Sequence, residues 1–196
     1  MAINDHAAGA TPLDPDEAEG LIPSHITTKE QLNEWEAENI LEGERWALSR
    51  RKKDVLDEKF VRDLHKQMFG KTWKWAGKFR KTEKNIGVAP DQVAVLLRNL
   101  IEDTRAQLQH NVDPPNEIAA KFHHRLVSIH PFANGNGRHA RLITDLLLAE
   151  HGLKAFTWGE GDLVHAGEVR EKYLAALRAA DRGNYGPLLG FVHSGK

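Results

Sequence analysis

The sequence predicts an all-α domain, a helical bundle arranged around a helix–loop–helix motif, with one small β-hairpin. Apolar residues recur at three-to-four spacing in several separate segments, which is the pattern of helices with one buried stripe. A glycine-rich loop at residues 134–137 divides two of these segments, and residues 79–90 interrupt the helical pattern. The length of 196 residues suits one well-buried domain rather than two.

Three regions are expected along the chain. Residues 1–26 hold three of the eight prolines and several acids, with few large apolar groups, and are expected to form an extended or partly disordered arm. Residues 27–54 are expected to form an N-terminal helix, which is a candidate regulatory element. Residues 55–196 are expected to form the main domain, which contains the motif at residues 128–141.

The first helices have recognisable ends. Thr28 and Gln31 form a capping box that opens a helix running to about residue 52. Asp57 is the expected N-cap of the next helix, and Gly70 closes it. Asp91 is expected to begin a third helix that continues to about residue 110.

The central motif lies at residues 128–141. A helix with a stripe from Ile118 to Ile129 ends before Pro131, so His130 lies at a helix C-terminus. The negative end of the helix dipole is expected to favour the protonated form of His130. A second helix is expected to start near Arg138 or His139, where a new apolar stripe begins.

The turn between these helices predicts an anion site. Gly135 and Gly137 flank Asn136 and permit a concave turn whose backbone N–H groups point inward at a helix N-terminus. Arg138 and Arg141 are three residues apart on one helix face, and guanidinium groups suit phosphate oxygens. The local hypothesis is a polyphosphate cradle with His130 at its rim as a general base for a hydroxyl nucleophile.

Composition excludes several classes of function. The 27 basic and 28 acidic residues nearly cancel, so no overall field predicts direct nucleic-acid or membrane binding. The absence of cysteine excludes thiolate metal sites and is compatible with a cytoplasmic protein. The N-terminus lacks the pattern of a secretory signal, and no apolar run is long enough to span a bilayer.

The motif resembles that of the Fic/Doc (Fido) family, in which His-Pro-Phe is followed by a variable residue, an acid, Gly-Asn-Gly-Arg and, three residues later, a second arginine. The match covers His130–Phe132, Gly135–Arg138 and Arg141. It fails at Asn134, where the family usually has a carboxylate. The stretches 35–40, 75–80 and 130–141 further resemble the "mobile mystery protein B" branch.

This resemblance implies a Fido fold and a protein adenylyltransferase that uses ATP with Mg²⁺ or Mn²⁺. His130 would deprotonate a Ser, Thr or Tyr hydroxyl of a target protein, while Asn134 stands at the metal position. The nucleotide would be held by Gly135, Asn136, Gly137, Arg138 and Arg141. The hairpin would be a flap that binds the target segment as an added strand, through Lys81, Thr82, Ile86, Gly87 and Val88.

Asn134 is neutral, so we expect weaker metal binding and slower turnover. Fic proteins are often restrained by a glutamate that pairs with the second motif arginine, and Glu42 is the candidate here. The branch implies a small helix-turn-helix partner, as in toxin–antitoxin pairs. Two alternatives remain: a Doc-like phosphotransferase, and a weakly catalytic nucleotide-binding regulator.

Overall fold

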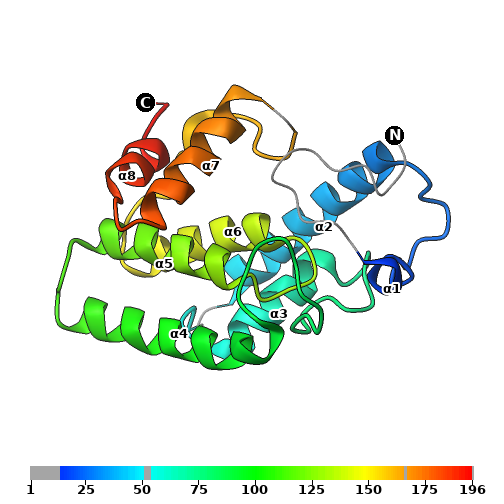
Figure 1. The fold of residues 1–196 in the computed structure, drawn as a ribbon, viewed down its shortest axis with the longest axis horizontal. Coiled ribbons are helices and arrows are strands. Elements are labelled where there is room, and N and C mark those ends of the chain that lie inside the picture. The colour runs from blue at the N-terminus through cyan, green and yellow to red at the C-terminus, as the bar shows by residue number, and fades with distance from the viewer. Residues whose placement is uncertain (1–13, 51–53, 166, 196) are drawn as a thin grey trace.

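The computed structural model describes residues 14–50, 54–165 and 167–195, and these residues form a helical bundle (Figure 1). Residues 1–13 of the expected arm and Arg51–Lys53 of the N-terminal region lie outside the described residues. The helices are α1 (Pro15–Ala18), α2 (Lys29–Ser49), α3 (Glu58–Phe69), α4 (Val93–Gln109), α5 (Pro115–Ile129), α6 (Asn136–Glu150), α7 (Glu168–Ala180) and α8 (Gly186–Val192), with short 3-10 turns η1 (Pro90–Gln92) and η2 (Trp158–Glu160).

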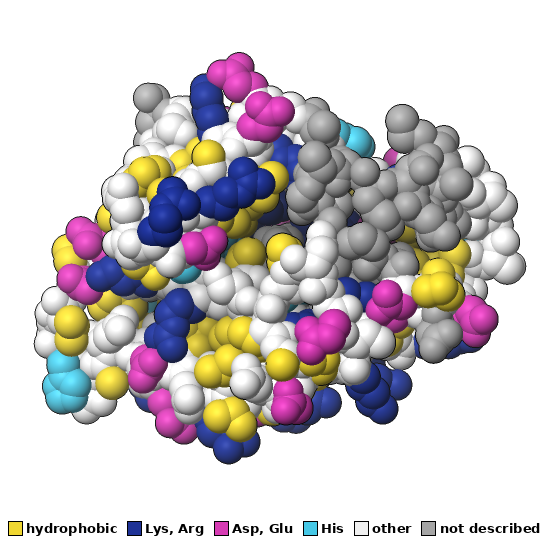
Figure 2. Space-filling model, viewed as in Figure 1, with side chains coloured by type: hydrophobic (Ala, Val, Ile, Leu, Met, Phe, Trp, Pro, Cys, Tyr) yellow, Lys and Arg dark blue, Asp and Glu magenta, His cyan; other side chains and the backbone are white. Residues whose placement is uncertain are grey.

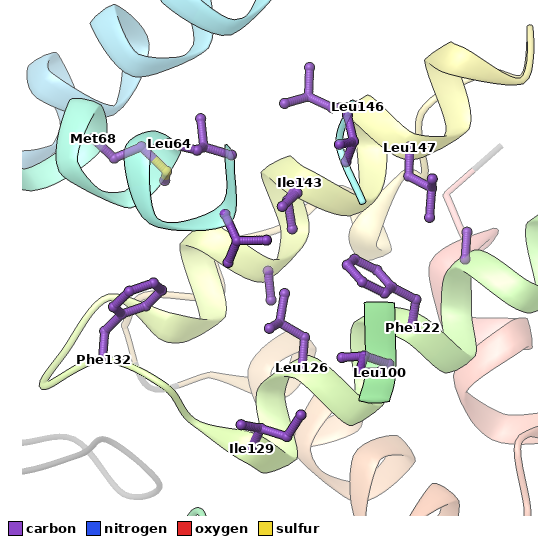
Figure 3. Packing of buried hydrophobic residues seen from close by; sticks show 14 of the residues in the cluster. Leu64, Met68, Leu100, Phe122, Leu126, Ile129, Phe132, Ile143, Leu146 and Leu147 are labelled. Carbon is purple, nitrogen blue, oxygen red and sulfur yellow. The ribbon is translucent and has the colours of Figure 1, made fainter. Parts of the chain in front are cut away.

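Helices α5 and α6 lie at the centre of the bundle and are joined by the motif loop. Figure 1 shows α4 below α5, and α7 and α8 above α5. Helices α2 and α3 lie together toward the right of the view. The apolar stripe of α5 faces α4 and α6, and Phe122, Leu126 and Ile143 are almost completely buried (Figure 3). The motif loop is therefore anchored at both ends by the main core.

The expected caps of the first helices are confirmed. The Thr28 side chain accepts from the Gln31 N–H, and the Gln31 side chain completes the capping box at α2. The Asp57 carboxylate accepts from the Phe60 N–H at 3.2 Å, and Gly70 is the C-cap of α3. These local patterns set the ends of helices that carry site residues.

Two local expectations are corrected. Asp91 lies inside η1, and α4 begins at Val93 without a side-chain cap. Helix α6 begins at Asn136, two residues earlier than expected, because Gly135 takes a left-handed conformation that starts the helix.

The β-hairpin expected within residues 79–90 is also absent from the described structure. These residues form bends without strand pairing, and the β-bridge between Leu21 and Trp73 lies outside them. The physical reason is a side chain: the Arg80 guanidinium donates to the carbonyls of Thr82 and Val88, which leaves those groups satisfied without a ladder.

The described part of the arm lies on this segment. The Trp75 indole donates to the Glu17 carbonyl at 3.0 Å, and the Lys84 ammonium pairs with the carboxylates of Asp14 and Glu17. Figure 2 shows basic and acidic side chains mixed over one face of the molecule. No helix of the described residues has the length and apolar character that a membrane span requires.

Candidate active site

His130 is the C-cap residue of α5 and takes a left-handed conformation, with φ 55° and ψ 60°. Only Asn, Asp and Gly adopt this region readily, so surrounding contacts must hold His130 there. The residue is 5% exposed, and its backbone N–H still donates to the Leu126 carbonyl at 3.2 Å. Its imidazole is thus placed at a fixed point beside the motif loop.

The expectation that the helix dipole favours protonated His130 is corrected by burial. Desolvation is the largest cause that lowers the pKa of His130. Together with the positive charges of Arg80 and Lys84, and against a hydrogen bond to the Val127 backbone, it brings this pKa to about 4. Loss of hydration therefore lowers the pKa of His130 by more than the dipole of α5 raises it. At neutral pH the imidazole is uncharged, which is the state that a general base requires.

The motif turn has the shape expected of an anion site. Gly135 caps α6 with φ 79°, and a Cβ there would lie 2.6 Å from the Phe69 ring. The Asn136 side chain accepts from the Phe132 N–H at 2.9 Å and donates to the Phe132 carbonyl at 2.8 Å. Because Asn136 stabilises the loop, the first N–H groups of α6, which have no partner within the helix, are held at one point.

Arg138 projects from the first turn of α6 and forms an ion pair with Glu36 of α2, at 2.6 Å between Nη1 and Oε2. The other oxygen of Glu36 accepts from the Trp73 indole at 2.7 Å, and its side chain is 4% exposed. Arg138 also lies over the Phe69 ring, 4.9 Å from the centroid. The predicted phosphate ligand is therefore already paired with a buried carboxylate.

Arg141 lies over the same turn. A Cβ at Gly137 would stand 3.6 Å from Nη1 of Arg141, so the guanidinium approaches the turn closely. The group is also 6.0 Å from the Tyr173 ring centroid, and burial lowers its pKa from the usual high value. Tyr173 in turn contacts Nε2 of His123 at 2.8 Å, which anchors this side of the site in α5 and α7.

Asn134 offers little to a resident metal ion. Its side-chain oxygen accepts from the Gly135 N–H at 2.6 Å, and the group is neutral. Over the ranges that the structure describes, no three His, Cys, Asp or Glu side chains gather as metal ligands. The protein residues alone do not fit a complete divalent-ion site.

The expected flap residues form an irregular loop beside His130. Lys81, Thr82 and Ile86 are exposed, and a Cβ at Gly87 would lie 2.7 Å from Cβ of His130. The Thr82 hydroxyl donates to the Glu17 carboxylate at 3.1 Å. The structure thus brings the predicted flap and the predicted base together, although not as a hairpin.

Glu42 is not brought to the motif. Its carboxylate pairs with Lys71 at 2.5 Å, and its side chain is 48% exposed. The carboxylate that reaches a motif arginine is Glu36, six residues earlier on α2. A signal for it was present: Glu36 belongs to a buried stripe of α2 that consists of Leu32, Glu36, Asn39, Gly43 and Ala47.

His65 is a second residue that the motif did not reveal. Its Nδ1 accepts from the Gly77 N–H at 3.0 Å, so Nε2 carries the proton and donates to the Asn134 carbonyl at 3.0 Å. Complete burial lowers the pKa of His65 well below its usual value and keeps the ring neutral. His65 therefore links α3 and the root of the 79–90 loop to the motif turn.

Comparison with known proteins finds relatives in sequence and in fold. Residues 55–148 match the family model described as Fic/DOC family. "Protein adenylyltransferase fic-1" of Caenorhabditis briggsae is 31% identical over 137 residues, which cover 67% of this chain and 25% of the relative. "Protein adenylyltransferase Fic" of Drosophila willistoni is 29% identical over 139 residues, 68% of this chain and 26% of the relative. The chain spans about a quarter of the length of these curated relatives.

Solved structures share the fold. The N-terminal Fic domain of a Bartonella quintana cell filamentation protein superimposes with a TM-score of 0.71 at 20% identity, covering 90% of this chain and 91% of that one. BepC of Bartonella tribocorum, solved with bound AMPPNP, gives a TM-score of 0.68 at 18% identity, covering 92% and 97%. These likenesses establish the all-α Fido fold.

Proposed function

We propose that this chain, whose residues 55–148 form a Fic/DOC family domain, is a protein adenylyltransferase that moves AMP from ATP to a Ser, Thr or Tyr hydroxyl of a target protein. The single observation that supports it most is the neutral, buried His130 beside a glycine turn at a helix N-terminus that carries two arginines. The names of the relatives as adenylyltransferases support the choice of reaction.

In the proposed reaction the target hydroxyl oxygen attacks the α-phosphorus of ATP. One P–O bond forms, the bond from the α-phosphorus to the bridging oxygen breaks, and pyrophosphate leaves. The hydroxyl proton passes to the uncharged imidazole of His130. The N–H groups of Gly135–Gly137 and the guanidinium groups of Arg138 and Arg141 stabilise the phosphate charge.

The proposal includes a divalent metal ion. Mg²⁺ and Mn²⁺ commonly enter such sites with several phosphate and water ligands and few protein ligands. Asn134 would supply the one protein oxygen of the motif loop, so the ion would depend on the bound nucleotide more than on the protein.

The target segment is proposed to bind along the loop of Lys81, Thr82, Ile86, Gly87 and Val88. Because Gly87 lies against His130, a segment on this loop would present its hydroxyl near the base. For restraint of activity, the buried pair between Glu36 and Arg138 supports Glu36 rather than Glu42, since Glu36 occupies a proposed phosphate ligand.

Three contextual parts complete the proposal: membership of the "mobile mystery protein B" branch, a small helix-turn-helix partner as in toxin–antitoxin pairs, and a cytoplasmic location. Co-expression with a candidate partner, followed by size-exclusion chromatography, tests the pairing. A complex that depends on the helix-turn-helix protein supports it, and separate elution contradicts it.

One alternative has an observation in its favour. Arg138 is paired with Glu36, and Asn134 carries no charge. Both features are expected of a nucleotide-binding regulator with little catalysis. Purified protein and His130→Ala are incubated with cell lysate and ATP labelled at the α- or γ-phosphate. Label from the α-phosphate alone, lost in His130→Ala, supports adenylylation; label from the γ-phosphate indicates a phosphotransferase, and no label indicates the regulator.

A further inference from the structure

Arg80 is a buried cation outside the motif, and its guanidinium is devoted to backbone carbonyls. The residue is 4% exposed. Its Nε donates to the His130 carbonyl at 2.7 Å, Nη1 donates to Thr82 at 2.9 Å, and Nη2 donates to Val88 and, at 3.4 Å, to Ile129. One side chain therefore joins the end of α5 to both ends of the 82–88 loop.

The backbone of Arg80 adds to this connection. Its N–H donates to the Pro131 carbonyl at 2.9 Å, so Arg80 contacts the carbonyls of Ile129, His130 and Pro131 in succession. These are the residues around the left-handed turn that places His130. A cation is also favoured at the C-terminus of a helix, where the last carbonyls lack partners within the helix.

The loop contacts His130 from the other side. Gly87 has φ 107°, and a Cβ there would lie 2.7 Å from both Cβ of His130 and Nη2 of Arg80. The Val88 N–H donates to the Ile129 carbonyl at 3.4 Å. Gly87 thus packs against both His130 and Arg80, and a side chain at this position would collide with them.

We propose that Arg80 is a positioning residue that holds His130 and the 81–88 loop as one unit, so that the base and the target-binding segment keep a fixed relation. This inference rests on the proposed function for its catalytic consequence. The planar fork of arginine makes several directed hydrogen bonds at once, whereas the ammonium of lysine is a point charge on a flexible stem. Lysine at residue 80 would therefore keep the charge and lose the connection.

Three variants of the full chain test this role. Arg80→Lys keeps a cation, Arg80→Met removes it, and Arg62→Met is the matched control. The Arg62 Nε also donates to a carbonyl at the root of the loop, that of Gly77 at 3.1 Å, and its guanidinium lies over the Phe79 ring. Arg62 donates to the Gly77 carbonyl, whereas Arg80 donates to the carbonyls around His130, so this control loosens the same loop at another point.

The first readouts need no activity. Histidine NMR, with the His130 signal assigned by its loss in His130→Gln, gives the pKa of His130, and amide hydrogen exchange reports on residues 81–88. Arg80 and Lys84 are the cations that lower the pKa of His130, so in Arg80→Met this pKa should rise. Exchange at residues 81–88 should increase in both Arg80 variants, and Arg62→Met should leave the pKa of His130 unchanged.

The kinetic readout separates positioning from binding. If modification is measurable, Arg80→Lys should lower kcat by about 10²-fold, the loss expected from a small misplacement of a reacting group, while KM for ATP changes little. Urea denaturation shows whether each variant is folded. If Arg80→Met does not fold, Arg80→Lys alone is used for the test.

The inference is overturned if both the exchange of residues 81–88 and the pKa of His130 stay at the wild-type values in folded Arg80 variants. A wild-type protein without adenylylation would instead overturn the proposed function, because the NMR and exchange results do not depend on it.

Discussion

Glu36 and Arg138 are 102 residues apart in the sequence, yet their side chains form an ion pair of 2.6 Å beside the motif turn. The pair joins α2, the helix of the N-terminal region, to the helix that begins with the glycine turn. A polyphosphate at this turn would have to compete with Glu36 for the guanidinium. The N-terminal helix is therefore connected to the site through one carboxylate.

Glu36→Gln should strengthen nucleotide binding. The amide keeps an acceptor for the Trp73 indole but leaves the charge of Arg138 free for phosphate. We expect the Kd for ATP to fall by about tenfold, which corresponds to about 1.4 kcal/mol. Isothermal titration calorimetry measures it, and a rise in self-modification should accompany it.

Glu42→Gln is the matched control on the same helix. Glu42 pairs with Lys71 at the surface, and exposed pairs contribute little. The affinity of the Glu42→Gln variant for ATP should stay at the wild-type value. An equal gain in both variants would contradict a specific role for Glu36.

The pH dependence of modification should reflect the lowered pKa of His130. A base with a pKa of about 4 is uncharged throughout the range from pH 5.5 to 7.5, so kcat/KM should be nearly constant there. A histidine with an ordinary pKa near 6.5 would lose about tenfold in activity over the same interval. Initial rates in buffers of constant ionic strength distinguish the two, and a tenfold fall toward pH 5.5 would contradict the buried, neutral state.

Local signals and long-range contacts differed in how well the sequence predicted them. The caps at Thr28 and Asp57 depend on residues three positions apart, and the glycine turn depends on backbone freedom, so short patterns sufficed. The Glu36–Arg138 pair depends on the packing of α2 against the motif, which no short pattern contains.

The loop of residues 79–90 shows why a local pattern can mislead. Its composition favours a hairpin. However, the carbonyls of Thr82 and Val88, which a β-ladder would use, accept hydrogen bonds from the Arg80 side chain instead. The prediction of a protonated His130 failed for a related reason. The helix end is a local feature that the sequence shows, whereas the burial that lowers the pKa depends on tertiary packing, in which Gly87 lies against His130.

Gly135→Ala should destabilise the protein at the motif turn. Its φ of 79° disfavours any Cβ, and that atom would lie 2.6 Å from the buried Phe69 ring. Left-handed strain alone costs about 1–2 kcal/mol, and displacement of a core ring adds to it, so we expect a total of about 3 kcal/mol. Urea denaturation gives the free energy of unfolding.

Gly152→Ala is the control that separates the cost of a left-handed backbone from the cost of a collision with Phe69. Gly152 has a similar φ of 70°, and nothing lies within 4 Å of its Cβ position. This variant should lose about 1 kcal/mol, from the backbone alone. Equal losses in the two variants would contradict close packing of Phe69 on the turn.

Asn134→Asp should raise modification activity in Mg²⁺. The aspartate oxygen can still accept from the Gly135 N–H, so the turn is expected to keep its shape, while the other oxygen gains charge that favours a divalent ion. Initial rates over a series of Mg²⁺ concentrations should show half-saturation at a lower concentration, by about tenfold.

Asn136→Asp is the contrasting change two residues later. The Asn136 amide donates to the Phe132 carbonyl, and a carboxylate would lose that donor and place its charge against the carbonyl oxygen. This variant should lose stability without any gain from Mg²⁺. If Asn134→Asp leaves the Mg²⁺ dependence unchanged in a folded protein, the neutral side chain does not limit metal use, and Asn134 is not the protein ligand of the ion.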